Sequence, residues 1–241
     1  MIEKKIHYIW LGGKPKNRFV SACINSWHKH LPDYEIIEWN EKNLDIKKLR
    51  QENSFFDACM KKKLWAFASD YLRLYVLYQE GGIYFDTDIQ VIRSLSPLLD
   101  NDFFVGYEEQ EKKTICTAVI GAEKNSKCIK RLLSFYEKEI FEKDLYINPS
   151  IFNFCISEDH ETFSKMTVYN QDFFAPFNPF GKNNAPVETN NTYTIHWYTG
   201  DWGMSRKGYV FLNTKHLHGM KKLYQIVRKN LGYYRRRFKK N

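Results

Sequence analysis

The stretch that most constrains the fold runs from residue 65 to residue 92, WAFASDYLRLYVLYQEGGIYFDTDIQVI. Apolar and aromatic side chains recur there at spacings of three and four as far as Tyr78, which predicts a helix with one buried stripe. Gly81 and Gly82 then interrupt the pattern, because glycine readily adopts the left-handed conformation that ends a helix. The apolar run from Ile83 to Phe85 is typical of a short buried strand. The segment therefore predicts a helix, a glycine stop and a strand.

Asp86 and Asp88 stand at the end of this predicted strand, where a rigid frame presents loop side chains to a ligand. In an extended chain, alternation would place both carboxylates on one side, with Thr87 facing away. Two neighbouring carboxylates repel each other and attract a hard cation. Mg²⁺ or Mn²⁺ held by such a pair usually completes its shell with water and substrate phosphates. The pattern therefore predicts a metal-bridged phosphate ligand.

A second D-x-D, Asp100-Asn101-Asp102, follows Pro97 and has the composition of an ordinary turn. Only the first pair follows a glycine break and an apolar strand. The surrounding sequence, rather than the tripeptide, favours a functional role for Asp86 and Asp88.

Asp70 and Arg73 are three residues apart in the predicted helix and therefore share one of its faces. Two interpretations are open for this pair. It contacts a ligand together with the acidic turn, or it is a surface ion pair of little energetic weight. Its position one helix upstream of Asp86 favours the first.

The run ASDYLRLYVLYQEGGIYFDTD, together with IHYIWLGG near the N-terminus, resembles the D-x-D sugar-transferase group. This group, of the glycosyltransferase family 32 type, includes yeast α-mannosyltransferases, bacterial capsule and lipopolysaccharide transferases, and the catalytic domains of clostridial glucosylating toxins. The resemblance covers the first half of the chain well and the last third at one motif. It implies an α/β fold of the GT-A type, a Rossmann-like single domain with a mixed central sheet flanked by helices. It also implies a metal-dependent transferase that retains anomeric configuration.

The resemblance also implies roles for individual residues. The residues implied in catalysis are Asp70, Arg73, Asp86 and Asp88. Those implied in donor binding are Trp10, Ser69, Asp70, Arg73, Tyr84, Asp86 and Trp202, and those implied as metal ligands are Asp86, Asp88 and His196. Trp10 would stack on the nucleotide base, and an ordinary core aromatic is an equally weighted alternative, since Trp is usually mostly buried.

The stretch YTIHWYTGDW, residues 193–202, predicts an extended run that delivers His196 to a turn at Gly200. A lone histidine is more often structural than a ligand, but members of the group carry a late His or acid and a Ser-Trp in a loop over the metal and diphosphate. Asp201 stands where that pattern has serine, which leaves its role open. His216 and His218 would point in opposite directions if extended, and we do not expect them to be ligands.

The remaining patterns predict a helix over 18–31 and strands over 34–39, 89–92, 103–107 and 115–120, with an amphipathic helix over 129–141. Residues 40–57 are polar and predict a connection with short helical turns. The aromatic and proline-rich region 145–180 predicts irregular, acceptor-facing structure, and the Asn-rich residues 183–191 predict a mobile loop.

Composition narrows the classes of function. The 241 residues are 43% hydrophobic, enough for one sizeable domain. No apolar run approaches the roughly 18 residues of a membrane span, and the N-terminus lacks the pattern of a signal peptide, so we expect a cytosolic protein. The five cysteines lack C-x-x-C spacing, which argues against a zinc site and predicts buried, reduced thiols. No G-x-G-x-x-G or P-loop motif is present.

The formal charge is +9, and seven basic residues with no acidic ones lie between Arg228 and Asn241. The positive charge thus belongs to the tail, which argues against nucleic-acid binding by the domain. We expect a GT-A domain over 1–215 and a basic amphipathic helix over 216–241. Its apolar stripe comprises Leu217, Met220, Tyr224, Val227, Leu231, Tyr234 and Phe238. It would dock on an anionic membrane, with part of the stripe packed on the domain; the alternative is a docked terminal helix with a solvated basic end.

The sequence therefore predicts a transferase that uses a nucleotide-sugar donor, with UDP favoured and GDP-mannose a second choice. The acceptor would be a saccharide or lipid-linked oligosaccharide in bacterial surface polysaccharide synthesis, such as capsule or lipopolysaccharide. One alternative is a Mg-dependent phosphohydrolase of the haloacid dehalogenase type, although Gln90 stands where that class has Thr or Val. The other is a non-catalytic sugar- or membrane-binding module.

Overall fold

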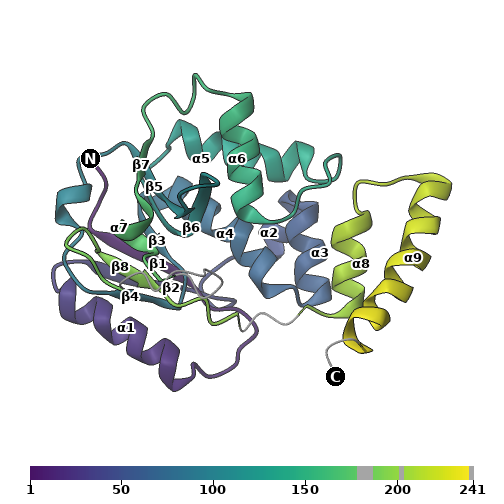
Figure 1. Cartoon of the computed structure of the whole chain (residues 1–241), viewed down its shortest axis with the longest axis horizontal. Helices are drawn as coiled ribbons and strands as arrows, with labels where there is room; N and C mark the ends of the chain where they lie inside the picture. Colours follow the sequence, from purple (N-terminus) through teal and green to yellow (C-terminus); the bar gives the residue numbers. More distant parts are fainter. Residues whose placement is uncertain (178–186, 201–203, 239–241) are drawn as a thin grey trace.

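The computed structural model describes residues 1–177, 187–200 and 204–238, with side chains as far as residue 233. A mixed sheet forms the centre of the molecule (Figure 1), with the strand order β2-β1-β3-β6-β5-β7. Its strands are β1 (Lys5–Ile9), β2 (Glu35–Trp39), β3 (Gly82–Phe85), β5 (Phe103–Glu109), β6 (Thr114–Ala122) and β7 (Thr167–Tyr169). β1 runs parallel to β2 and β3, whereas β6 is antiparallel to both β3 and β5, and β7 is parallel to β5. The predicted mixed α/β architecture is confirmed.

Two apolar cores lie on opposite faces of this sheet. One face is covered by α4 (Trp65–Glu80), α5 (Lys127–Ser134) and α6 (Asn148–Glu158), whose side chains pack with those of β6. The other face is covered by α1 (Arg18–His30) and by a second, two-stranded sheet of β4 (Ile89–Val91) and β8 (Thr194–His196). Trp27 of α1 is fully buried there, and its indole N–H donates to the Ile89 carbonyl at 2.7 Å. This contact fixes the chain directly after the acidic turn.

Two regions contain more helix than the sequence predicted. Residues 40–57 were expected to form short turns, but α2 (Ile46–Glu52) and α3 (Ser54–Lys62) occupy most of them. Asn53 separates the two helices and caps α3 by accepting from the Phe56 amide at 2.8 Å. Phe55 and Phe56 are fully buried. Tertiary burial of this aromatic pair thus outweighs the polar composition that suggested a loop.

The prediction of irregular structure over 145–180 was also wrong in part. Pro149 stands in the first turn of α6, where a missing backbone N–H costs no hydrogen bond, so it starts a helix here. β7 and the short helix α7 (Gln171–Phe174) follow. The helix predicted over 129–141 divides into α5 and a π-helical turn, η2 (Phe135–Glu139), while η1 (Ser96–Leu98) is a single 3₁₀ turn. The mobile loop predicted at 183–191 lies partly outside the described residues and stays a prediction.

The chain ends in a helical hairpin formed by α8 (Arg206–Thr214) and α9 (Gly219–Phe238), which lie side by side at one end of the molecule (Figure 1). α8 contacts α3, and α9 packs on α8. Among the described residues, no helix is long and apolar enough to cross a membrane. All five cysteines are buried and free, as predicted.

Candidate functional site

The glycine pair after α4 sets the path of the chain into the site. Gly81 and Gly82 have φ angles of 66° and 95°, in the left-handed region that favours glycine. A Cβ on Gly82 would lie 2.8 Å from the Lys5 carbonyl oxygen, and one on Gly81 would lie 2.7 Å from the Lys124 amide. The ring of the buried His7 bonds the Gly81 carbonyl at 2.7 Å. The helix therefore ends in a close turn that feeds β3 into the middle of the sheet beside β1.

Asp86 and Asp88 lie on a tight turn rather than on an extended chain. The Asp86 amide donates to the Ala118 carbonyl at 2.9 Å, and the Ile89 amide then donates back to the Asp86 carbonyl at 3.1 Å. Both carboxylates face one pocket, as predicted, but a turn rather than strand alternation places them there, and Thr87 lines the same pocket instead of facing away. The turn itself brings the two side chains together.

The second sheet brings a residue from far along the chain to this turn. Antiparallel pairing of β4 with β8 sets His196 opposite Ile89, directly after the acidic turn. His196 Nε2 lies 3.4 Å from Asp88 Oδ1. One ligand atom each from Asp86, Asp88 and His196 can be chosen so that all three lie within 4.8 Å of one another. Two carboxylates and an imidazole at this spacing could hold a divalent cation such as Mn²⁺ or Mg²⁺.

The surroundings of Asp88 keep it ionised. Burial would raise its pKa, but the hydrogen bonds from His196 and Thr199 lower it below the ordinary value. The backbone amide and hydroxyl of Thr199 both donate to Asp88 Oδ2, at 3.0 and 3.2 Å. Burial likewise opposes a charge on His196, yet Asp88 raises the pKa of this histidine to about 10. The His196 imidazole must therefore lose a proton before one of its nitrogens can bind a cation.

Arg73 connects the helix to the acidic turn. Its guanidinium lies 2.8 Å from Asp70 Oδ1 and 3.2 Å from Asp86 Oδ1, and it donates to the Thr117 carbonyl at 2.6 Å. It also stacks 4.6 Å from the ring centre of Tyr84, whose hydroxyl donates to Asp86 at 2.8 Å. The Arg73 and Asp70 side chains are only 6% and 13% exposed, so the surface ion-pair interpretation was wrong. Asp86 is held from behind by a buried network.

A pocket of about 300 Å³ opens in front of the acidic turn and extends to the end of β1. Because β1 and β3 are parallel neighbours, Trp10 and Asp86 emerge at the same edge of the sheet. The residues that line this pocket include Trp10, Lys14, Asn17, Trp65, Tyr84, Asp86, Thr87, Asp88 and Thr199. Its walls thus combine aromatic rings with carboxylates, the mixture that suits a ligand with a flat ring and an anionic group.

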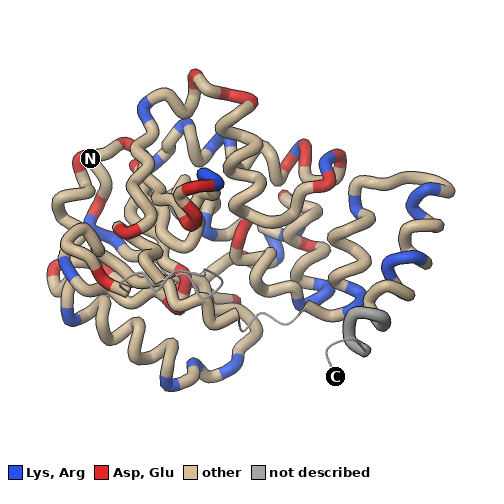
Figure 2. Tube along the Cα trace, in the orientation of Figure 1, with Lys and Arg blue, Asp and Glu red and all other residues tan. Residues whose placement is uncertain are grey.

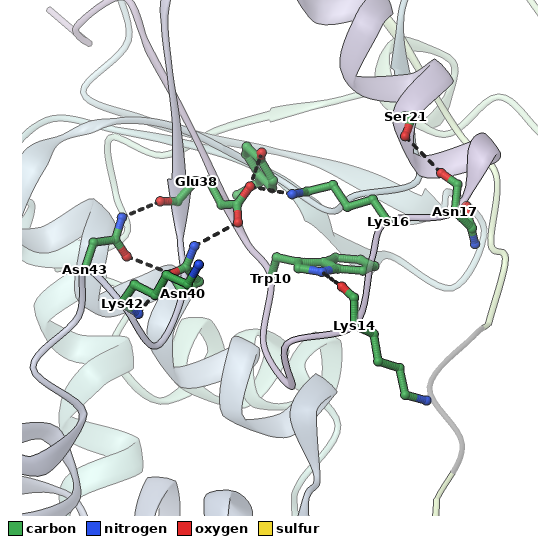
Figure 3. Close-up of polar contacts among 10 residues, drawn as sticks. Trp10, Lys14, Lys16, Asn17, Ser21, Glu38, Asn40, Lys42 and Asn43 are labelled. Carbon is green, nitrogen blue, oxygen red and sulfur yellow. Dashed lines mark hydrogen bonds and ion pairs between the residues drawn. The ribbon is translucent and has the colours of Figure 1, made fainter.

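Trp10 is half-buried and has a fixed orientation in this pocket. Its indole N–H donates to the Lys14 carbonyl at 2.6 Å, and the Lys16 ammonium lies 5.6 Å from its ring centre. Figure 3 shows the ring between these two lysines, with Lys16 reaching on to Glu38. Trp10 packs partly on the core, as the core alternative expected, and it also lines the pocket, so its stacking on a nucleotide base stays a prediction.

Sequence reasoning missed three residues around His196. Thr199 bonds Asp88, as described above, and the ring centre of Tyr198 lies 3.9 Å from that of His196. Tyr198 adopts a φ of 50°, a backbone conformation that is uncommon outside glycine and concentrates at functional sites. Glu108 of β5 lies beside Tyr198 and His196, and burial raises its pKa. Tyr198 and Thr199 could have been predicted from the sequence, because they lie two and three residues after His196. Glu108 lies in an acidic run, and no feature of the sequence distinguishes it from its acidic neighbours.

The structure gathers most of the predicted site residues but not all of them. Trp10, Tyr84, Asp86 and Asp88 line the pocket, whereas Ser69 and Arg73 are buried and the largely buried Asp70 pairs with Arg73 behind Asp86. The predicted positions Asp201 and Trp202 lie outside the described residues. Among the described residues, His216 belongs to no group of potential metal ligands. Its Nδ1 lies 3.5 Å from Asp144 Oδ1.

Comparisons with known proteins agree with this geometry. Residues 18–105 match the family described as the glycosyltransferase sugar-binding region containing a DXD motif. The Subversion of eukaryotic traffic protein A of Legionella pneumophila is 24% identical over 171 residues, which cover 60% of this chain and 26% of that protein. Inositol phosphoceramide mannosyltransferase 3 of Schizosaccharomyces pombe is 30% identical over 98 residues, covering 41% of this chain and 27% of that protein. The chain thus spans about a quarter of each relative.

Among solved structures, the PaToxG glycosyltransferase is similar with a TM-score of 0.51 and 20% identity, over 68% of this chain and 73% of that one. The predicted GT-A fold is confirmed. The predicted D-x-D sugar-binding glycosyltransferase region is confirmed for residues 18–105. Because the family match includes the acidic turn, it favours a glycosyltransferase over the phosphohydrolase alternative.

Proposed function

We propose that this chain, which carries the DXD sugar-binding region of glycosyltransferases on a GT-A fold, moves a sugar from a nucleotide-sugar donor to an acceptor with the help of a divalent cation. One observation supports this most strongly. Asp86 and Asp88, which lie with His196 in a possible cation site, line the same pocket as Trp10. A nucleotide diphosphate needs both a cation site and an aromatic surface, and here the two share one pocket.

Asp86, Asp88 and His196 would hold Mn²⁺ or Mg²⁺. Such a cation neutralises the negative charge that develops on the departing nucleotide diphosphate. Thr199 orients Asp88 through two hydrogen bonds, and Tyr84 and Arg73 orient Asp86. A network fixed in advance in this way costs no reorganisation during the reaction.

Trp10 would stack on the base of the donor, and UDP is the favoured nucleotide. The resemblance assigns Asp70 and Arg73 to the donor sugar, and from their position behind Asp86 they would act on the donor through this aspartate, whose position Arg73 fixes. Ser69 would support this helix turn from within the core, and Trp202 would close over the donor. The reaction would retain the configuration at the anomeric carbon, as the family resemblance implies.

The acceptor would be a saccharide or a lipid-linked oligosaccharide in surface polysaccharide synthesis. The fission-yeast relative is named for mannosyl transfer to a ceramide lipid, which supports a lipid-linked acceptor and keeps mannose as a second candidate sugar. A cytosolic enzyme held at the inner face of the cytoplasmic membrane would meet such an acceptor there.

A panel of nucleotide sugars tests this proposal. UDP-glucose, UDP-galactose, UDP-N-acetylglucosamine and GDP-mannose are incubated with the full chain in Mn²⁺, in Mg²⁺ and in excess chelator, and released nucleotide is measured. We expect Mn²⁺-dependent hydrolysis of one donor well above the others. Hydrolysis unaffected by chelator would contradict the cation site, and binding of a donor without turnover would favour a non-catalytic sugar-binding module.

A further inference from the structure

The outer face of α9 is apolar. Met220, Tyr224, Val227 and Leu231 are 80%, 66%, 55% and 63% exposed. They recur at spacings of three and four, so they form one continuous stripe along the helix. Leu223, also exposed, widens it on one side. We call these five residues the outer stripe.

An ordinary surface helix turns its apolar stripe toward the core, whereas α9 turns its outer stripe away from the domain. The half-buried residues on its packed side are largely polar. The Lys229 ammonium bonds the side-chain oxygen of Asn213 on α8 at 3.0 Å and lies 5.8 Å from the ring centre of Tyr209. Of the predicted stripe, Leu217 is half-buried, whereas Met220, Tyr224, Val227 and Leu231 face away from the domain. The side chains of Tyr234 and Phe238 lie outside the described residues, so their packing stays a prediction.

Charge indicates what covers the outer stripe. Residues 219–241 contain nine Lys and Arg and no Asp or Glu. Lys221 and Arg228, both exposed, stand three residues before and four residues after Tyr224, so they border the stripe. Figure 2 shows basic segments and no acidic one along the described part of α9. An apolar stripe bordered by cations matches the boundary between lipid headgroups and acyl chains.

A second copy of the chain is a poorer partner for this face. Two such helices laid together would bring their basic borders close, and like charges at an interface oppose association. An anionic bilayer instead supplies both apolar depth and negative phosphates. We propose that α9 lies flat on an anionic membrane surface, with the outer stripe inserted and its basic residues against the phosphates.

Co-sedimentation of the full chain with vesicles tests this proposal independently of any sugar transfer. Vesicles of phosphatidylcholine with phosphatidylserine are compared with vesicles of phosphatidylcholine alone. Met220→Gln/Val227→Gln removes apolar groups from solvent-facing positions and should lower the affinity for anionic vesicles about tenfold or more. Lys221→Gln/Arg228→Gln should lower it about 25-fold, since each basic residue near anionic lipid is worth about fivefold.

The matched control for charge is Lys47→Gln/Lys138→Gln, which removes two exposed lysines from other helices. It should bind vesicles as the unaltered chain does. All variants should keep Mn²⁺-dependent donor hydrolysis, because α9 lies away from the acidic turn (Figure 1). Equal binding to phosphatidylcholine alone, or equal loss in the control, would overturn the proposal. So would a lipid-free dimer that the stripe variant converts to a monomer in light scattering, because the stripe would then be covered by a second copy.

Discussion

The D-x-D pattern occurs twice in this chain, and its two copies have different surroundings. Asp86 and Asp88 follow a fully buried strand, and their side chains are 28% and 14% exposed. In the second copy, Asp100 and Asp102 are exposed. Asn101 between them stabilises the turn by donating to the Leu98 carbonyl and the Tyr169 hydroxyl. The same tripeptide thus forms a candidate cation site in one place and a turn in the other. The difference comes from the neighbours that confine the carboxylates.

The sharpest test of this difference is one amide substitution in each copy. Asp88→Asn removes a ligand charge at the proposed cation site, and cation stabilisation of a leaving diphosphate is worth several kcal/mol. We expect Mn²⁺-dependent turnover to fall by about a thousandfold or more. Asp102→Asn makes the same chemical change on an exposed turn and should leave turnover unchanged. Rates of donor hydrolysis in saturating Mn²⁺ measure both, and equal effects would remove the distinction between the two copies.

The next test concerns the buried network behind the first copy. Arg73→Lys keeps the charge but loses the planar fork that reaches Asp70, Asp86 and the Thr117 carbonyl together. Turnover should fall about a hundredfold, with a loss of about 1–3 kcal/mol in the free energy of unfolding because buried partners lose hydrogen bonds.

Arg131 provides a matched control. It pairs with Glu139 at 2.8 Å from a half-buried position on α5, away from the pocket. Arg131→Lys should leave turnover within about twofold, since lysine preserves a simple ion pair of low energetic weight. Loss of stability without loss of turnover in Arg73→Lys would assign that residue to the core alone.

Two late histidines allow the same comparison on the other side of the site. His196 lies 3.4 Å from Asp88 and His216 lies 3.5 Å from Asp144, so both face an aspartate. Within the described part of the chain, only His196 joins a group of potential ligands. His196→Gln should weaken Mn²⁺ binding about tenfold to a hundredfold, because imidazole is a better ligand for a transition metal than the carboxamide of glutamine. His216→Gln should have no effect. Titration calorimetry with Mn²⁺ in the presence of nucleotide compares them, and an unchanged affinity in His196→Gln would limit the cation site to the two aspartates.

The sequence predicted the first copy well because its signals are local. The helix period, the glycine stop and the apolar strand lie within residues 65–85, and the structure places α4 and β3 where these signals indicate. The pairing of His196 with Asp88 depends on β4, which ends at Val91, and β8, which begins at Thr194. The two strands are separated by 102 residues, and no local pattern encodes their pairing. The position of Glu108 beside Tyr198 and His196 could not be predicted either, because it also depends on contacts between distant parts of the chain. On α9 the periodicity was correct, but periodicity shows only that one face is apolar and does not say whether that face points toward the domain.

The smallest effect on turnover is expected from Asp70, whose ionisation should instead set how the stability of the buried network depends on pH. Burial raises the pKa of Asp70 to about 6 from its ordinary 3.8, despite the ion pair with Arg73. The folded state therefore binds this proton more tightly than the unfolded state does. The resulting stabilisation is fully present below about pH 4 and is lost as the pH rises through about 6. Its upper limit is about 3 kcal/mol.

Asp70→Asn removes this ionisation, so the variant should lose less stability than the unaltered chain between about pH 4.5 and pH 7.5. Urea unfolding at both pH values measures the difference. Asp57→Asn is the control, because hydrogen bonds from Lys61 and Arg50 lower the pKa of Asp57 despite its partial burial. Its contribution is present above the ordinary value and is lost only as the pH falls below about 4, so this substitution should leave the difference between the two pH values unchanged. If Asp70→Asn also leaves the difference unchanged, the carboxylate is ionised throughout this range, and Arg73 rather than burial controls its charge.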